Sequence, residues 1–162
     1  MPRKPAYAIG DIVNHKILGQ SIVLGHQYSK FTWYHIYSEK FNRFGYYLGA
    51  SFELTKPATA TTIQEAQNLL LQIRNTNPTG PYKSGDVLYE RNTRLLVIDN
   101  GRQCDQNNMT TYLVYNEKED RLYYMDFAGC AQVIQQSNLH TRKFVGKIMC
   151  DRIFDQAFST TT

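Results

Sequence analysis

Aromatic and basic side chains interleave over residues 30–47, which is the part of the sequence with the clearest chemistry for binding. Within an expected strand over residues 32–38, side chains alternate between two faces, so Trp33 and Tyr37 share a face. Tyr47, on the next expected strand, is predicted to point outward with them. Three cations in the adjoining loops complete the candidate binding residues, which are Trp33, Tyr37, Tyr47, Lys30, Lys40 and Arg43.

The opposite, inward face is assigned by the same alternation. Tyr34 and Ile36 form an apolar pair on the first of these strands, and Tyr46 and Leu48 are predicted to point inward on the second. In the second half of the chain the rule predicts inward Tyr112, Val114, Tyr123 and Met125, and outward Tyr124.

The outward aromatic face has several interpretations. Rings interleaved with cations bind single-stranded nucleic acid, because bases stack on the rings and cations follow the phosphates. Tryptophan, tyrosine and arginine also dominate protein–protein hot spots, and an aromatic cage can hold a methylated lysine. In a fourth interpretation a helix or the other half of the chain covers this face, since large exposed apolar patches are uncommon on monomers.

Catalytic and metal-binding patterns are absent from the sequence. The histidines and cysteines show neither H-x3-H nor C-x-x-C spacing; they are His15, His26, His35, His140, Cys104, Cys130 and Cys150. Nothing marks His140 with Cys104 or Cys130 as a base and its nucleophile. We therefore expect a protein that is not an enzyme and has no catalytic residues, no metal and no cofactor.

Composition and charge limit the class of protein. The chain has 162 residues, 42% of them hydrophobic and 20% charged, which is typical of a folded protein. No apolar run is long enough to span a bilayer, and neither a secretory signal nor an even cysteine count appears, so we expect a cytoplasmic protein. Residues 1–80 hold eight Lys/Arg and four Asp/Glu, whereas residues 81–162 hold ten of each. An acidic partner should therefore contact the first half.

An internal repeat organises the chain. Residues 7–13 (YAIGDIV) recur as residues 82–88 (YKSGDVL), and Tyr-rich segments at 34–37 and 46–48 recur at 112–115 and 123–125. The offsets are 75, 78 and 77, which indicates conserved strands and variable loops over two copies, 7–56 and 82–135. The Gly-Asp pair in each copy is interpreted as a turn before the first strand.

The expected elements are mainly β. Short branched and aromatic runs in each copy predict antiparallel strands, with a hairpin over 38–45 and a shorter counterpart over 116–120. A capping box formed by Thr62 and Glu65 predicts an amphipathic helix over 62–75. A second helix is expected over 139–158, with Phe154 and Phe158 outside its apolar stripe.

These elements predict an α+β protein of two small antiparallel barrels joined by an amphipathic helix. The expected parts are a first barrel at 1–56, a helix-containing linker at 57–81, a second barrel at 82–135, and a C-terminal helix with a loose tail at 136–162.

The segment Ile9-Gly10-Asp11-Ile12-Val13, followed by residues 22–24 and 34–37, resembles the start of SH3-like and Tudor-like small barrels. That class includes KOW-type domains and the polymerase-binding domain of CarD-type regulators. The chain departs from a strict KOW motif because it lacks the glycine-rich loop. The resemblance implies a module that binds protein or nucleic acid and is seldom a catalyst.

The expected function is therefore macromolecule binding, as a protein-binding adaptor or inhibitor of the kind that also occurs among phage and mobile-element proteins. Nucleic-acid binding by the first barrel is the alternative. A protein partner or larger complex is preferred because dedicated nucleic-acid binders concentrate more cations than a net charge of +4.

Overall fold

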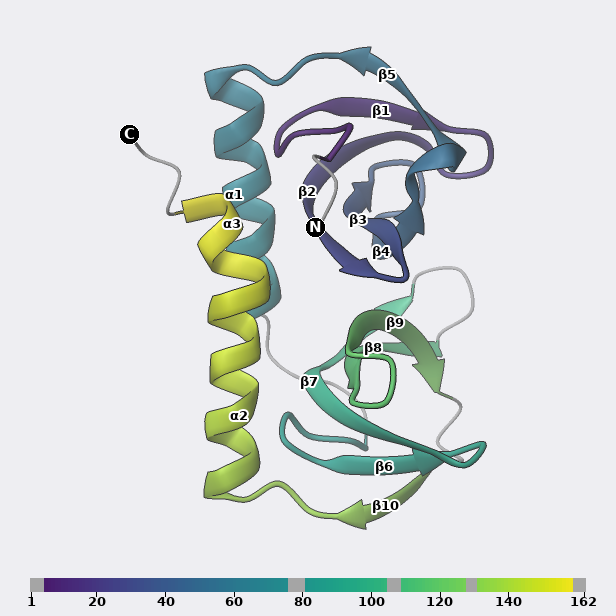
Figure 1. Ribbon diagram of the computed structural model, residues 1–162, viewed down its shortest axis with the longest axis vertical. Helices are drawn as coiled ribbons and strands as arrows, with labels where there is room; N and C mark the ends of the chain where they lie inside the picture. The colour runs from purple at the N-terminus through teal and green to yellow at the C-terminus, as the bar shows by residue number, and fades with distance from the viewer. Residues whose placement is uncertain (1–4, 76–80, 105–108, 128–130, 159–162) are drawn as a thin grey trace. The chain divides into compact units, whose positions relative to one another are not determined.

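The computed structural model describes residues 5–75, 81–104, 109–127 and 131–158. They form two compact units, one made of residues 1–73 with 153–162 and the other of residues 74–152. Each unit holds one five-stranded antiparallel sheet and helical segments, so the expected α+β class is confirmed (Figure 1). Between the described strands neither sheet closes on itself, so the barrel description is not confirmed.

The first unit has the strand order β4-β3-β2-β1-β5. Its elements are β1 (Ile12–His15), β2 (Gly19–Ser29), β3 (Phe31–Ser38), β4 (Arg43–Leu48), the 3-10 turn η1 (Gly49–Ser51), β5 (Phe52–Lys56), α1 (Ala60–Asn75) and α3 (Asp155–Phe158).

The second unit has the matching order β10-β6-β7-β8-β9. Its elements are β6 (Val87–Glu90), β7 (Thr93–Cys104), β8 (Met109–Asn116), β9 (Arg121–Phe127), β10 (Gln132–Gln135) and α2 (Leu139–Met149). A π-helical turn, η2 (Cys150–Phe154), follows α2 along the chain and precedes α3.

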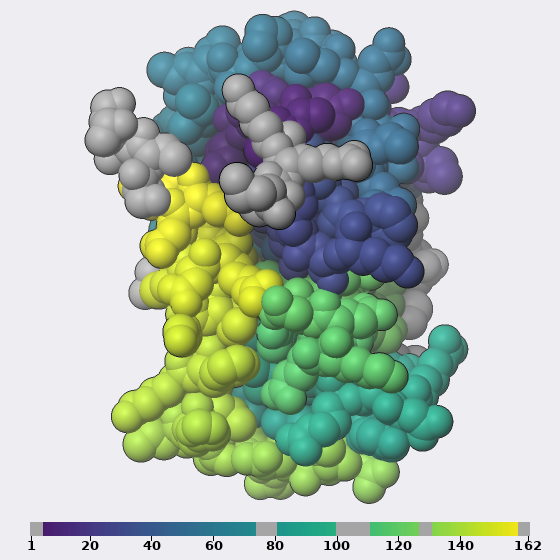
Figure 2. Space-filling model, viewed as in Figure 1, coloured from purple at the N-terminus to yellow at the C-terminus, as the bar shows by residue number. Residues whose placement is uncertain are grey.

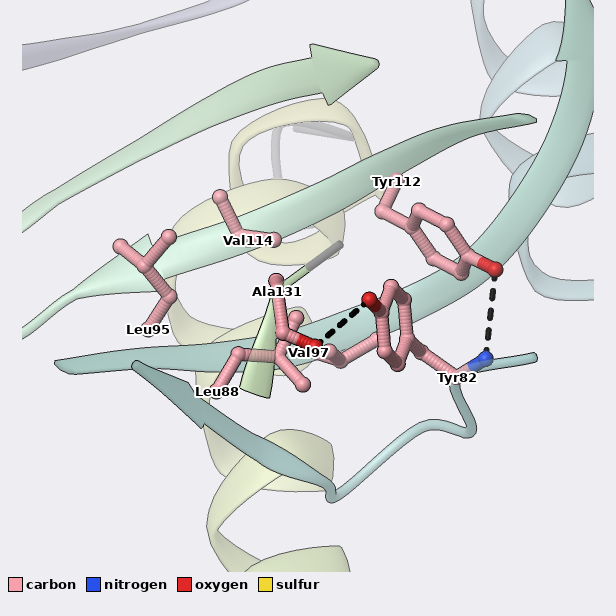
Figure 3. Close-up of a cluster of buried hydrophobic side chains, with 7 residues drawn as sticks. All are labelled: Tyr82, Leu88, Leu95, Val97, Tyr112, Val114 and Ala131. Atoms are coloured by element: carbon pink, nitrogen blue, oxygen red, sulfur yellow. Dashed lines mark hydrogen bonds between the residues drawn. The ribbon is translucent and has the colours of Figure 1, made fainter. Parts of the chain in front are cut away.

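Each unit has a buried core on one face of its sheet. In the second unit this cluster comprises Tyr82, Leu88, Leu95, Val97, Tyr112, Val114 and Ala131 (Figure 3). The Tyr82 hydroxyl donates to the Ala131 carbonyl at 2.8 Å, and the Tyr82 N–H donates to the Tyr112 hydroxyl at 3.3 Å. The buried core of the first unit comprises Val13, Leu18, Val23, Tyr34, Ile36 and Phe52. The inward assignment of Tyr34, Ile36, Tyr112 and Val114 is therefore confirmed.

The Gly-Asp turns are built alike in the two units. Gly10 N–H donates to the Val23 carbonyl at 2.8 Å, and the Asp11 carboxylate accepts from Ala8 N–H at 2.9 Å and from Ala58 N–H at 2.8 Å. The structural interpretation of this aspartate holds, because both carboxylate oxygens bond backbone amides.

In the second unit the same three hydrogen bonds recur. Gly85 N–H donates to the Val97 carbonyl at 2.8 Å, while the Asp86 carboxylate accepts from Lys83 N–H at 2.8 Å and from Ser137 N–H at 2.7 Å. The second amide donor, Ala58 in the first unit and Ser137 in the second, lies just before a helix. The order of elements is therefore the same in both units, with α1 after β5 and α2 after β10.

The two helices also begin with the same cap. At α1, Thr59 Oγ1 accepts from Thr62 N–H at 3.2 Å and Thr62 Oγ1 accepts from Thr59 N–H at 2.8 Å. At α2, Asn138 and Thr141 exchange the equivalent bonds, both at 2.9 Å. The repeated element is therefore five strands with their helix.

The predicted capping box of Thr62 with Glu65 is wrong. The helix begins at Ala60, so Thr62 belongs to its first turn and Thr59 caps it. The predicted amphipathic character of this helix is confirmed, since Ala66, Leu70 and Ile73, which recur at helical spacing, are buried.

The C-terminal segment is helical as expected, with one correction. Phe154 was expected outside the apolar stripe but is only 9% exposed. A π-helical turn carries more residues than an α-helical turn, so η2 rotates the residues that follow relative to the stripe of α2.

Candidate binding site

Strands β3 and β4 determine which face each aromatic side chain occupies. Trp33 lies directly opposite Leu48, and Tyr37 lies opposite Phe44. Directly opposed residues of an antiparallel pair share a face, so these four side chains lie on the face away from the core. The predicted placement of Trp33 and Tyr37 on one face is confirmed.

Tyr47 lies on the other face, so its predicted outward orientation is wrong. It pairs with core residue Tyr34 and packs against the core, with its ring centroid 5.5 Å from that of His15 and 6.4 Å from that of Phe52. Tyr46, which was predicted to point inward, lies on the Trp33 face.

A one-residue error in the predicted register explains this reversal. Strand pairing joins Tyr34 to Tyr47 and Tyr112 to Met125, so β4 and β9 match at an offset of 78 rather than 77. A slip of one residue moves every side chain of a strand to the opposite face. In the second unit the inward assignment of Tyr123 and Met125 is confirmed, since both pack against the core.

The two hairpin loops have the same length, contrary to expectation. Ser38 pairs with Arg43 and Asn116 pairs with Arg121, which leaves residues 39–42 and 117–120 between the paired residues. Because the two loops are equally long, the offset between the two copies is 78 on both sides of the loop. The predicted change of this offset from 78 to 77 is therefore excluded.

The candidate cations lie at two ends of the strand pair. Lys30 precedes β3, and its Nζ lies 5.9 Å from the centre of the Phe31 ring. Lys40 follows β3, and its Nζ lies 5.3 Å from the centre of the Phe41 ring. Half-buried Arg43 begins β4 at that second end. Because the eight residues of β3 extend over about 26 Å, Lys30 and Lys40 do not converge on one site.

One end of the face forms an exposed apolar surface. Phe31 is 56% exposed and Leu48 is 37% exposed. Half-buried Trp33 lies two residues after Phe31 in β3 and directly opposite Leu48 in β4. The Trp33 indole N–H donates to the Ser29 carbonyl at 3.2 Å, which fixes the ring. We call Lys30, Phe31, Trp33 and Leu48 the Trp33 cluster.

The remainder of the Trp33 face is largely buried. His35 stacks on Tyr46 with ring centroids 4.5 Å apart, and Phe44 is 5% exposed. Half-buried Tyr37 donates its hydroxyl hydrogen to Asn42 Oδ1. These side chains are therefore buried or half-buried, and the exposed part of this face is the Trp33 cluster.

Sequence reasoning missed Phe31 and Leu48. The register error placed Leu48 inward, and the expected strand began one residue after Phe31. Extending the alternation back from Trp33 by two residues would have put Phe31 on the same face.

The histidines, cysteines and acidic residues in the described part of the chain are not grouped as a metal site would require. No group of three His, Cys, Asp or Glu side chains there could hold a metal ion. Cys150 is an exposed free thiol, while the side chains of Cys104 and Cys130 lie outside what the structure describes. Among the described helices, none combines the length and apolar character of a membrane span.

Comparison with known proteins returned no match to a family model, and no curated protein or solved structure has significant similarity to the chain.

Proposed function

We propose that the protein is a non-catalytic binding module and that the Trp33 cluster contacts a protein partner. The observation that carries the proposal is the exposure of Phe31 and Leu48 beside Trp33 on one sheet face. Exposed apolar clusters mark interaction sites, and tryptophan is the residue most enriched at the energetic centre of protein interfaces.

The charge of the first unit indicates the chemistry of the partner. Lys30 belongs to the cluster, and the first unit, residues 1–73 with 153–162, holds seven Lys/Arg and five Asp/Glu. A partner surface with an apolar side chain next to a carboxylate complements both features. The hydrogen bond from Trp33 to Ser29 holds the indole before binding, which lowers the entropic cost of association.

In this proposal each unit is an SH3-like or Tudor-like small barrel, and the protein is a cytoplasmic adaptor or an inhibitor of the kind that phages encode. The curved strands of the two five-stranded antiparallel sheets (Figure 1) support the barrel description, and the resemblance at residues 9–13 supports the class. Such barrels serve as platforms whose surface side chains determine the partner.

Affinity capture with matched variants tests the proposal. A partner retained by the parent chain and then purified should bind Trp33→Ala at least about 30-fold more weakly, because hot-spot truncations cost about 2 kcal/mol or more. Ile17→Ala, which removes another exposed apolar side chain of the same unit, should bind as the parent chain does. Equal affinity of the parent and Trp33→Ala, with both folded by circular dichroism, would contradict the proposal.

Single-stranded nucleic acid is the second candidate, because the Lys30 ammonium lies 5.9 Å from the centre of the Phe31 ring, and Phe31 shares a sheet face with Trp33, so bases could stack on both rings. Fluorescence anisotropy with a labelled oligonucleotide at low salt tests it. Stacking predicts that Trp33→Ala weakens binding by about 1–3 kcal/mol, whereas Lys30→Ala lowers the salt dependence. Absence of binding at low salt would exclude this candidate.

A further inference from the structure

A second surface feature lies in the second unit, within residues 74–152. A pocket of about 210 Å³ opens between strands β6 and β7, the end of β10 and the first turn of α2. Figure 2 shows α2 at the surface of this unit, and His140 in its first turn is exposed. The pocket is smaller than those that hold drug-sized molecules, so its size suits a small metabolite.

Two opposite charges line this pocket. Arg94 on β7 and Glu117, just after β8, both border it and also border an adjoining hollow of about 360 Å³. Within the described residues neither side chain forms an ion pair, with the other or with any other residue. Both side chains are exposed in a shared hollow and form no direct ion pair there, so both can contact a ligand.

Polar and apolar side chains form the rest of the wall, and the polar ones are Gln135, His140 and Thr141. Val87 and Leu96 are 6% and 4% exposed and form its floor, while Phe144 of α2 is 38% exposed at its side. A ligand in this pocket would therefore meet a cation, an anion and an apolar surface.

We infer that the pocket binds a small zwitterion of the α-amino acid class. The forked guanidinium of Arg94 receives the carboxylate of the ligand, and Glu117 accepts hydrogen bonds from its ammonium group. The apolar substituent lies against Leu96 and Phe144. A simple anion fits less well, because Glu117 would repel it. The inference is independent of the Trp33 cluster.

Isothermal titration of the full chain with L-valine, L-leucine and L-methionine tests the assignment. At least one should bind, and the leucine analogues that lack one charge, 4-methylpentanoate and 3-methylbutylamine, should bind at least tenfold more weakly than leucine if leucine is the ligand. The corresponding deaminated and decarboxylated analogues serve for the other two amino acids.

Variants connect the binding to the pocket. Arg94→Gln and Glu117→Gln should each weaken binding of the amino acid at least tenfold, while Arg142→Gln, an exposed cation of α2 outside the pocket lining, should not. Three results would overturn the inference: no binding of any of the three amino acids at millimolar concentration, equal binding of a carboxylate without an amine, or unchanged binding by Glu117→Gln. Amide NMR spectra confirm that each variant is folded.

Discussion

Asp86 joins two parts of the second unit that are distant in sequence. Its carboxylate accepts from Lys83 N–H, three residues before it, and from Ser137 N–H, 51 residues after it. Asp86 is 6% exposed, so little water reaches its carboxylate. An ionised carboxylate suits this position because its two oxygens accept from both amides at once.

Asp86→Ala should lower the free energy of unfolding by about 1–3 kcal/mol for each of the two amides that it leaves without an acceptor. Asp86→Asn should cost less, because the amide side chain keeps one acceptor oxygen. Urea denaturation measures both, with the exposed Asp151→Ala as the control. Equal stability of Asp86→Ala and Asp151→Ala would contradict the role assigned to the carboxylate.

Ionisation of Tyr115 should make the free energy of unfolding depend on pH. Burial, followed by its hydrogen bond to Asp120, raises the pKa of Tyr115 to about 12, against an ordinary value of 10.0. Arg152, whose guanidinium lies 2.5 Å from the Asp120 carboxylate, partly offsets this increase in the pKa of Tyr115.

Because the folded state holds this proton more tightly than the unfolded chain, Tyr115 contributes stability below pH 10 that is lost as the pH rises from about 10 to about 12. Ultraviolet difference titration should show Tyr115→Phe missing one late-ionising phenol, and its unfolding free energy should fall less over this interval than that of the parent chain. An identical late titration in the variant would show that Tyr115 is not this group.

At the scale of elements, a glycine turn lets each helix approach its sheet. Gly10 has φ +92° and Gly85 has φ +96°, a region that side chains with a Cβ rarely adopt. A Cβ on Gly10 would lie 3.0 Å from the backbone nitrogen of Ile63 in α1, and one on Gly85 would lie 3.1 Å from Thr141 Oγ1 in α2. The first turn of each helix therefore packs where only glycine leaves space.

Gly85→Ala should destabilise the protein by about 1 kcal/mol or more, because both the backbone conformation and the contact with α2 become strained. Gly146→Ala is the matched control, since this glycine lies within α2 and nothing lies within 4 Å of the added Cβ. It should instead stabilise the protein by about 0.5–1 kcal/mol. Thermal unfolding of both variants gives the two signs, and the same sign for both would refute the explanation.

At the scale of the whole molecule, the end of the chain completes the first unit. Residues 153–162 belong to this unit together with residues 1–73. The Gln156 side chain of α3 accepts from His26 N–H at 2.9 Å and donates to the His26 carbonyl at 2.7 Å. Gln67 Nε2 of α1 donates to the Ala157 carbonyl at 2.7 Å, so α3 bonds to both β2 and α1.

A chain that ends at Arg152 should therefore lose protection in the first unit. Hydrogen exchange should accelerate at the His26 amide, which loses its acceptor, and remain slow in β8 of the second unit. Gln156→Ala should reproduce part of the effect, whereas Gln64→Ala, on the exposed surface of α1, should not. Unchanged exchange at His26 in the truncated chain would show that α3 does not stabilise β2.

Local patterns in the sequence were sufficient to identify the main elements. Alternation along residues 32–38 placed Tyr34 and Ile36 in the core, because the side-chain period of a strand does not depend on its partners. The repeated Gly-Asp pairs identified the two turns, and apolar spacing identified the helix that ends at Asn75. These features need only a few consecutive residues.

Features that depend on a partner element were decided by the tertiary structure. The face of Tyr47 follows from its pairing with Tyr34, and the burial of Phe154 follows from a π-helical turn that apolar spacing does not reveal. The side chains around the pocket come from segments separated by many residues, as Arg94, Glu117 and His140 do. Local periodicity in the sequence was enough to predict the strands, turns and main helical segments of the two units. The strand register and the set of side chains that meet at the surface were decided only in the folded protein, because both depend on contacts between residues far apart in the chain.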